Sequence, residues 1–135
     1  MKTFVSPTFI MLPRKRTKDR KIALNLNVYR NTHHNILNTI KQQYNEIMKP
    51  QMEGVILKTP ISIEFRYFKP THRESDKANV LSIVEKFFCD ALEHWGCIPR
   101  DNDEFIKVHT YLPTRYDKNN GRVEIKVLEN QGVVL

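Results

Sequence analysis

Apolar and polar residues alternate along several segments of the chain, and a period of two is typical of β-strands. Residues 22–28 follow this pattern strictly, and residues 61–68 follow it again. Residues 3–12 are apolar and predict an extended N-terminal segment. Residues 105–112 and 122–127 predict two further strands, the last with three inward residues: Val123, Ile125 and Val127.

The period changes to that of an α-helix in two longer segments. Asn31 or Thr32 can cap the first helix, which is expected to end at Pro50. The second helix spans about residues 76–94. The order is then β-β-α-β-α-β-β, with one hairpin at the first connection and another at the turn sequence YDKNNG. We therefore expect a single α+β domain, residues 1–135, in which two helices pack on one mixed sheet.

The second predicted helix has a polar stripe beside its apolar face. Ser75 is its expected N-cap. At 100° per residue, its main apolar residues fill about 140° of arc. Asn79, Lys86 and Asp90 fall within about 40° of one another at the edge of that face. Asp76 lies next to this stripe. Polar side chains at the border of a buried face are expected to line a cleft.

Two more acids follow this helix after a short loop. If the next strand lies beside the helix, three or four carboxylates converge: Asp76, Asp90, Asp101 and Asp103. Their repulsion is costly unless a cation neutralises it, and carboxylates suit Mg²⁺ or Mn²⁺. In a basic protein, such a site suggests phosphodiester hydrolysis, in which Lys86 would neutralise the scissile phosphate. The alternative is a solvated helix flank on which Lys86 and Asp90 form an ordinary surface pair.

Charge changes this picture because it is distributed unevenly. The net charge is +7, but residues 1–73 hold 14 Lys and Arg against 4 Asp and Glu, and residues 74–135 hold 8 against 11. Six basic residues lie at the first predicted hairpin: Arg14, Lys15, Arg16, Lys18, Arg20 and Lys21. A solvated loop can have this composition. In a chain with a candidate metal site, we expect the segment to contact DNA phosphates, which gives affinity without base specificity.

The sequence gives no sign of a membrane segment or a secretion signal. No apolar run is long enough to cross a bilayer, and Pro7 interrupts the N-terminal apolar residues. We therefore expect an N-terminal edge strand and a cytoplasmic protein. Cys89 and Cys97 do not have zinc-site spacing and are expected to be reduced and buried.

The stretch DKANVLSIVEKFFCDALEHWGCIPRDNDEFI, followed by GRVEIKV, resembles the RusA family of Holliday-junction resolvases, which are common in phages and prophages. That family shows Asp-x-Asp-Asn, a helical Lys, Asp-Ala-Leu, a Gly, an acidic pair and a C-terminal hairpin. The resemblance covers roughly residues 60–128. It implies a RusA-like fold and a Mg²⁺-dependent homodimer that cuts four-way DNA junctions in a bacterial or phage-infected cell. It also implies the following roles: Asp76, Lys86, Asp90 and Asp101 as catalytic residues, the three aspartates with Asp103 as metal ligands, and Asn79 as a supporting residue.

The sequence departs from the family pattern at three places. Ala78 stands where the family has its second Asp, and Arg100 replaces the first residue of the acidic pair. The helical Lys also lies about one turn further from the Asn than in the best-known members. Asp103, or alternatively Glu74, would supply the missing carboxylate. These departures leave two alternatives open: a non-catalytic branched-DNA-binding protein on the same fold, and an unrelated nucleic-acid-binding module.

Overall fold

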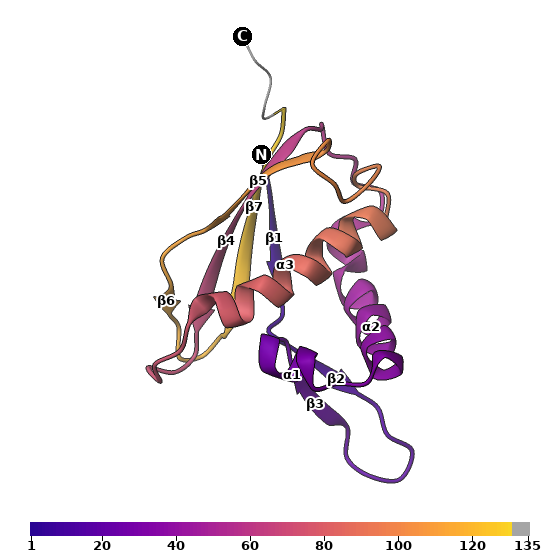
Figure 1. The fold of residues 1–135 in the computed structure, drawn as a ribbon, viewed down its shortest axis with the longest axis vertical. Helices are drawn as coiled ribbons and strands as arrows, with labels where there is room; N and C mark the ends of the chain where they lie inside the picture. The colour runs from indigo at the N-terminus through magenta and orange to yellow at the C-terminus, as the bar shows by residue number, and fades with distance from the viewer. Residues whose placement is uncertain (131–135) are drawn as a thin grey trace.

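A mixed sheet forms the centre of the computed structural model, which describes residues 1–130 (Figure 1). Its strands are β1 (Lys2–Ser6), β4 (Ile61–Lys69), β5 (Ile106–Tyr111), β6 (Arg115–Tyr116) and β7 (Arg122–Leu128). The order across the sheet is β1-β7-β4-β5, and β6 pairs with the end of β4. β7 runs antiparallel to both neighbours, whereas β5 and β6 run parallel to β4. The α+β class and the mixed sheet predicted from the sequence are confirmed.

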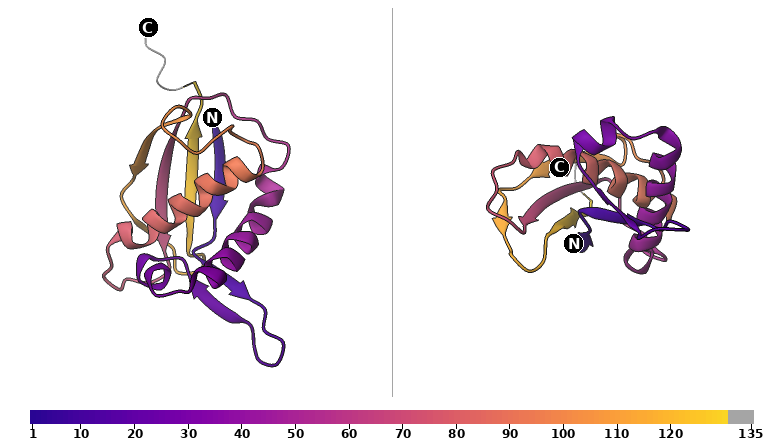
Figure 2. Two further views of the ribbon diagram at one scale, coloured as in Figure 1. Left: turned by 45° about the vertical axis from the view of Figure 1, so that its right-hand side comes forward. Right: turned by 90° about the horizontal axis from the view of Figure 1, so that it is seen from below.

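The helices lie on one side of this sheet (Figures 1 and 2). They are α1 (Leu26–Arg30), α2 (His34–Met52) and α3 (Lys77–His94). α3 crosses the sheet, and its buried Phe88 makes edge contacts with Phe4 of β1 and Phe65 of β4. On β7 the predicted inward residues are fully buried: Val123, Ile125 and Val127. Alternation on the strands and the helical period on α3 therefore meet in one apolar layer.

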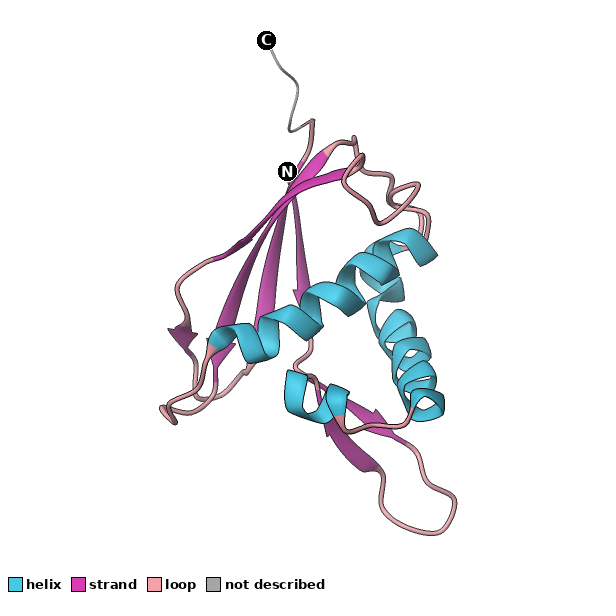
Figure 3. Ribbon diagram, viewed as in Figure 1, coloured by secondary structure: helices cyan, strands magenta, loops and turns pink. Residues whose placement is uncertain are grey.

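The first predicted hairpin is a separate two-stranded sheet that projects from the body (Figures 1 and 3). It consists of β2 (Phe9–Leu12) and β3 (Arg20–Ala23). The strand predicted over residues 22–28 is wrong beyond Ala23, because the chain turns into α1. The side chain of Asn25 accepts a hydrogen bond from the backbone N–H of Val28 at 2.9 Å. Asparagine is a favoured N-cap and a poor strand residue, so the cap overrides the alternation.

The C-terminal strands also pair differently from the expected hairpin. β5 and β7 lie on opposite sides of β4 and do not touch as a ladder. The turn sequence YDKNNG instead joins β6 to β7, and Phe68 of β4 is the register partner of both Arg115 and Arg122. Because α3 provides the crossover that a parallel strand requires, β5 can take the outer side of the apolar strand β4.

The helix ends differ from the predictions by one or two residues. His33, rather than Asn31 or Thr32, is the N-cap of α2, and Pro50 lies inside its last turn. The side chain of Asp76, rather than that of Ser75, caps α3 by accepting a hydrogen bond from Ala78 N–H at 3.0 Å. The helix continues past Pro50 despite its missing N–H donor, and this last turn buries Met52.

The structure also describes the two cysteines and the length and apolar character of the helices. Cys89 and Cys97 are both free thiols and both buried, as predicted. Within residues 1–130, no helix combines the length and the apolar character needed to cross a bilayer.

Candidate functional site

Two carboxyl groups meet where α3 leads into the loop before β5. Asp90 lies in the last turns of α3, and Asp101 lies in the loop. The backbone N–H of Asp101 donates to the carboxylate of Glu93 at 2.8 Å, which holds the loop against the helix. The pKa of Asp101 is raised, first because neighbouring groups shield it from water, then because of the negative charge of Asp90 and a hydrogen bond between the two carboxyl groups. The structure therefore brings together two of the four acids expected at this site.

The lysine beside this acid pair comes from α2. Lys41 Nζ lies 3.4 Å from an Asp90 carboxylate oxygen, and both side chains remain partly exposed. Lys86 points elsewhere: its Nζ lies 6.0 Å from the centre of the Tyr29 ring on α1. The surface pair between Lys86 and Asp90, the alternative interpretation of the stripe, is not among the ion pairs of the described residues. Only the packing of α2 against α3 could place Lys41 here, because it lies 49 positions before Asp90 in the sequence.

The other predicted residues are not gathered at the acid pair. Asp76 caps the opposite end of α3, about 21 Å from Asp90 at 1.5 Å per residue. Its carboxylate is used at the helix N-terminus. Asn79 lies in the first turn of the same helix, and Asp103 is exposed in the loop. Across residues 1–130, no group of three or more His, Cys, Asp or Glu side chains is arranged to hold a metal ion.

A second polar cluster adjoins the pair on the side of β5. One carboxylate oxygen of Glu85, on α3, lies 3.1 Å from His109 Nδ1 and accepts a hydrogen bond from the Tyr111 hydroxyl at 3.2 Å. The pKa of His109 is raised, chiefly by the hydrogen bond to Glu85, with smaller contributions from the charges of Asp101 and Asp103. The acidic loop and the histidine thus share one electrostatic environment.

This cluster has no signal in the sequence pattern. Glu85 falls outside the polar stripe of the helical wheel, and the sequence does not show which strand pairs with the strand that carries His109. The parallel pairing of β5 with β4 sets His109 opposite Ile63 and Tyr111 opposite Phe65, on the face that α3 covers. A strand that pairs in parallel with β4 after the crossover helix α3 has one face covered by that helix. Only knowledge of this parallel pairing places His109 and Tyr111 against α3.

The basic segment covers the connection between β2 and β3 and the first two residues of β3. All six of its predicted DNA-contacting residues are exposed: Arg14, Lys15, Arg16, Lys18, Arg20 and Lys21. None of them forms an ion pair with another residue of the described chain. Arg14 Nε donates to the Lys18 carbonyl at 2.9 Å, and Lys21 lies over the Phe9 ring at 4.3 Å. Unpaired cations on a projecting hairpin are available to a polyanion.

Comparison with known proteins gives no family assignment. No family model matches this chain, and no curated protein matches it. The resemblance to the RusA family therefore stays a prediction based on the motif residues.

Proposed function

We propose that this protein is a Mg²⁺- or Mn²⁺-dependent endonuclease that cuts branched DNA, including four-way junctions, in the cytoplasm of a bacterium or a phage-infected host. The observation that carries the proposal is the proximity of the Asp90 and Asp101 carboxyl groups, whose interaction raises the pKa of Asp101, with Lys41 Nζ at 3.4 Å from Asp90. Two neighbouring carboxylates beside a cation are a chemical arrangement suited to phosphoryl transfer. The projecting basic hairpin supports the choice of a nucleic acid as substrate.

Two carboxylates are sufficient protein ligands for a magnesium ion. Mg²⁺ in proteins is usually held by one or two carboxylates, while water and substrate phosphate oxygens complete its octahedral shell. The raised pKa of Asp101 reflects in part the charge of Asp90, which Lys41 offsets only partly and a divalent cation would compensate further. Asp90 and Asp101 would hold the ion, with Asp103 as a further donor from the same loop. The bound ion would supply charge stabilisation and a more acidic water molecule.

The protein's own residues would have distinct tasks around the scissile phosphate. Lys41 balances the charge of Asp90 and would lie close to a phosphate bound at the pair. The cations at Arg14 to Lys21 would hold the DNA backbone and set the salt dependence of binding. A homodimer with twofold symmetry would present two such sites to the two related strands of a junction.

Cleavage of a synthetic four-way junction tests the proposal. The full chain should cut it with Mg²⁺ and not with EDTA, and Asp101→Asn should abolish cutting while junction binding stays intact or becomes stronger. Glu104→Gln is the matched control, since this exposed acid lies in the same loop outside the pair. Normal cutting by Asp101→Asn would overturn the assignment of the site.

The two lysines provide a sharper test of the geometry. If the acid pair is the reactive centre, Lys41→Ala should slow single-turnover cleavage at least tenfold, an effect of about 1.4 kcal/mol. The resemblance to the RusA family assigns that role to Lys86 instead, whose side chain faces Tyr29. Equal single-turnover rates for Lys41→Ala and the wild type, with a slow Lys86→Ala, would favour the motif over the geometry.

The same fold also supports a second candidate, a branched-DNA-binding protein without catalysis. The observation in its favour is the position of Asp76, which removes this predicted metal ligand from Asp90 and Asp101 at the other end of α3. This candidate predicts specific binding of four-way junctions by the full chain and no cutting with Mg²⁺ or Mn²⁺.

A further inference from the structure

An exposed pair of stacked aromatic rings lies at the end of the sheet away from the acid pair. The rings of His72 and Tyr116 have centroids 3.6 Å apart and planes inclined by 26°. One face of each ring is covered by the other, yet both residues are exposed, with 44% of Tyr116 accessible. Within the described residues, no other aromatic ring and no cation lies over either ring.

The two segments that carry His72 and Tyr116 adjoin the same end of β4. Tyr116 belongs to β6, and its register partner on β4 is Lys69. The backbone N–H of the next residue, Asp117, donates a hydrogen bond to the Lys69 carbonyl at 2.9 Å. His72 lies in the segment that follows β4, just after Pro70. A Cβ atom added to Gly121 would lie only 2.9 Å from the Pro70 ring, so this glycine allows the two segments to pack closely.

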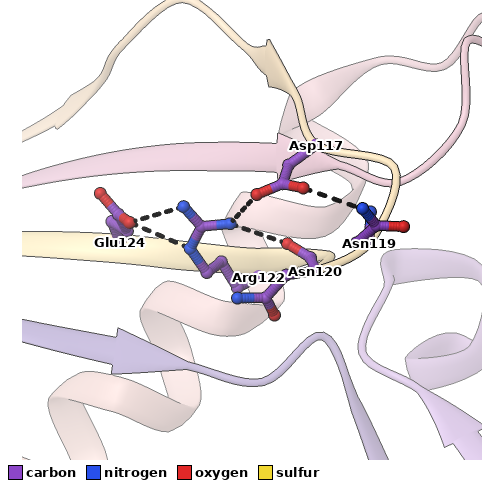
Figure 4. Close-up of polar contacts among 5 residues, drawn as sticks. All are labelled: Asp117, Asn119, Asn120, Arg122 and Glu124. Atoms are coloured by element: carbon purple, nitrogen blue, oxygen red, sulfur yellow. Dashed lines mark hydrogen bonds and ion pairs between the residues drawn. The ribbon is translucent and has the colours of Figure 1, made fainter.

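A polar network fixes the turn that follows Tyr116 (Figure 4). The guanidinium group of Arg122 contacts Asp117 at 2.8 Å, Glu124 at 2.8 Å and the Asn120 carbonyl at 2.8 Å. The same group lies 4.0 Å from the centre of the Phe68 ring. Arg122 thus ties the turn to β4 and β7, so the position of the neighbouring aromatic ring is set before any ligand binds. A preformed surface lowers the ordering cost of binding.

The surroundings of the stack are basic. The segments 69–77 and 113–122 hold six Lys and Arg residues against three Asp and Glu residues. Arg73 and Arg115 are the sequence neighbours of the two rings, and Lys118 lies two positions beyond Tyr116. All three are exposed, and none forms an ion pair within residues 1–130. Free cations beside an open aromatic surface complement a ligand that combines a planar ring with phosphate.

We propose that His72 and Tyr116 form a stacking platform for an unpaired base of branched DNA, whose flanking phosphates contact Arg73, Arg115 and Lys118. Aromatic side chains bind bases of single-stranded nucleic acids in this way regardless of sequence, because every base has a π-face. The platform lies at the N-terminal end of α3, and the acid pair lies near the C-terminal end of this 18-residue helix. A strand bound at both places would have its unpaired base held well away from the phosphate at the acid pair.

The choice of branched DNA as ligand rests on the proposed function, but the test is independent of cleavage. The full chain is titrated, in EDTA, with a forked DNA that carries 2-aminopurine at its first unpaired position. Stacking on the platform should quench the probe. Tyr116→Leu, which keeps an apolar side chain without a ring, should remove the quenching and weaken binding of the fork roughly tenfold. Tyr116→Phe, which keeps the ring, should behave as the wild type, and both variants should bind plain duplex as tightly as the wild type.

Each outcome bears on the platform separately from the nuclease proposal. Lost quenching in Tyr116→Leu and retained quenching in Tyr116→Phe would support the platform even if no DNA is ever cut. Equal quenching and equal fork affinity in Tyr116→Leu and the wild type would overturn it, whether or not Mg²⁺-dependent cleavage is found. Competition by free dAMP as strong as by the fork would also overturn it, because the site would then bind a mononucleotide rather than a strand.

Discussion

Replacement of Asp101 by asparagine should stabilise the protein near neutral pH. In the wild type, the Asp101 carboxyl group is partly shielded from water and touches Asp90, so its pKa is raised in the folded state. A raised carboxyl pKa means that the folded protein binds more protons than the unfolded one between the ordinary and the raised value. Stability therefore falls as the pH rises through that window, and the full cost is present at pH 7. Asparagine keeps the shape and a hydrogen-bond donor while removing the charge.

The size of the effect follows from the exposure of the pair and from the nearby lysine. Two unit charges about 4 Å apart repel each other by about 1 kcal/mol in a water-like dielectric and by about 4 kcal/mol at an effective dielectric constant near 20. Asp101 is exposed on its loop, and Lys41 offsets part of the charge of Asp90, so the lower figure applies. A gain of about 1 kcal/mol corresponds to a rise in Tm of roughly 4 °C for a chain of this size.

Thermal unfolding followed by circular dichroism measures this gain. The difference between Asp101→Asn and the wild type should be present near pH 7 and vanish near pH 3, below the ordinary aspartate pKa of about 3.9. Mg²⁺ at about ten times its Kd should raise the stability of the wild type by about 1.4 kcal/mol and that of the variant by less. Glu104→Gln should leave Tm nearly unchanged. An equal or lower Tm for Asp101→Asn at pH 7 would refute the reasoning that the two carboxyl groups oppose each other in the fold.

Three further predictions concern the neighbouring cluster, the sheet edge and the core. Glu85→Gln should return the pKa of His109 toward its ordinary value, as measured by NMR. The stability that the Glu85–His109 pair contributes is fully present below the ordinary histidine pKa, and it is lost as the pH rises through the raised pKa of His109. Gln51→Ala should cost about 1 kcal/mol in urea unfolding, because the Gln51 amide makes hydrogen bonds of 2.8 Å to both the N–H and the carbonyl of Val5 at the outer edge of β1. Phe88→Ala should cost about 3–5 kcal/mol, since this fully buried ring contacts two others, and a loss below 1 kcal/mol would contradict its central place in the core.

The sequence determined most of the local structure. The periods of two and of 3.6 residues identified the strands β4 and β7, the helix α3 and the faces that each of them buries. These signals are local, because a side chain's direction depends on its position along its own element. The failure at residues 24–28 was also local: one asparagine side chain bonded to a backbone N–H outweighed two further alternating residues.

Axial distance along α3 separated Asp76 from the acid pair. A helical wheel shows the angle of each residue around the axis and ignores its position along it, so Asp76 and Asp90 looked like neighbours although about 21 Å separates them. That distance was implicit in the sequence once the helix was known to be unbroken. The approach of Asp101 to Asp90 was expected on the condition that the next strand lies beside the helix, and the chain turns back at Gly96, whose positive φ of 74° follows the end of the helix.

Only the tertiary structure decided which strands pair and which side chains from other elements join the acids. The expected C-terminal hairpin is replaced by two strands on either side of β4, a pairing between segments distant in sequence that no local pattern records. That choice places His109 beside Glu85, and the packing of α2 against α3 places Lys41 beside Asp90. Both contacts join residues more than 20 positions apart, so they follow from the burial of apolar surface by the whole chain rather than from the residues that make them.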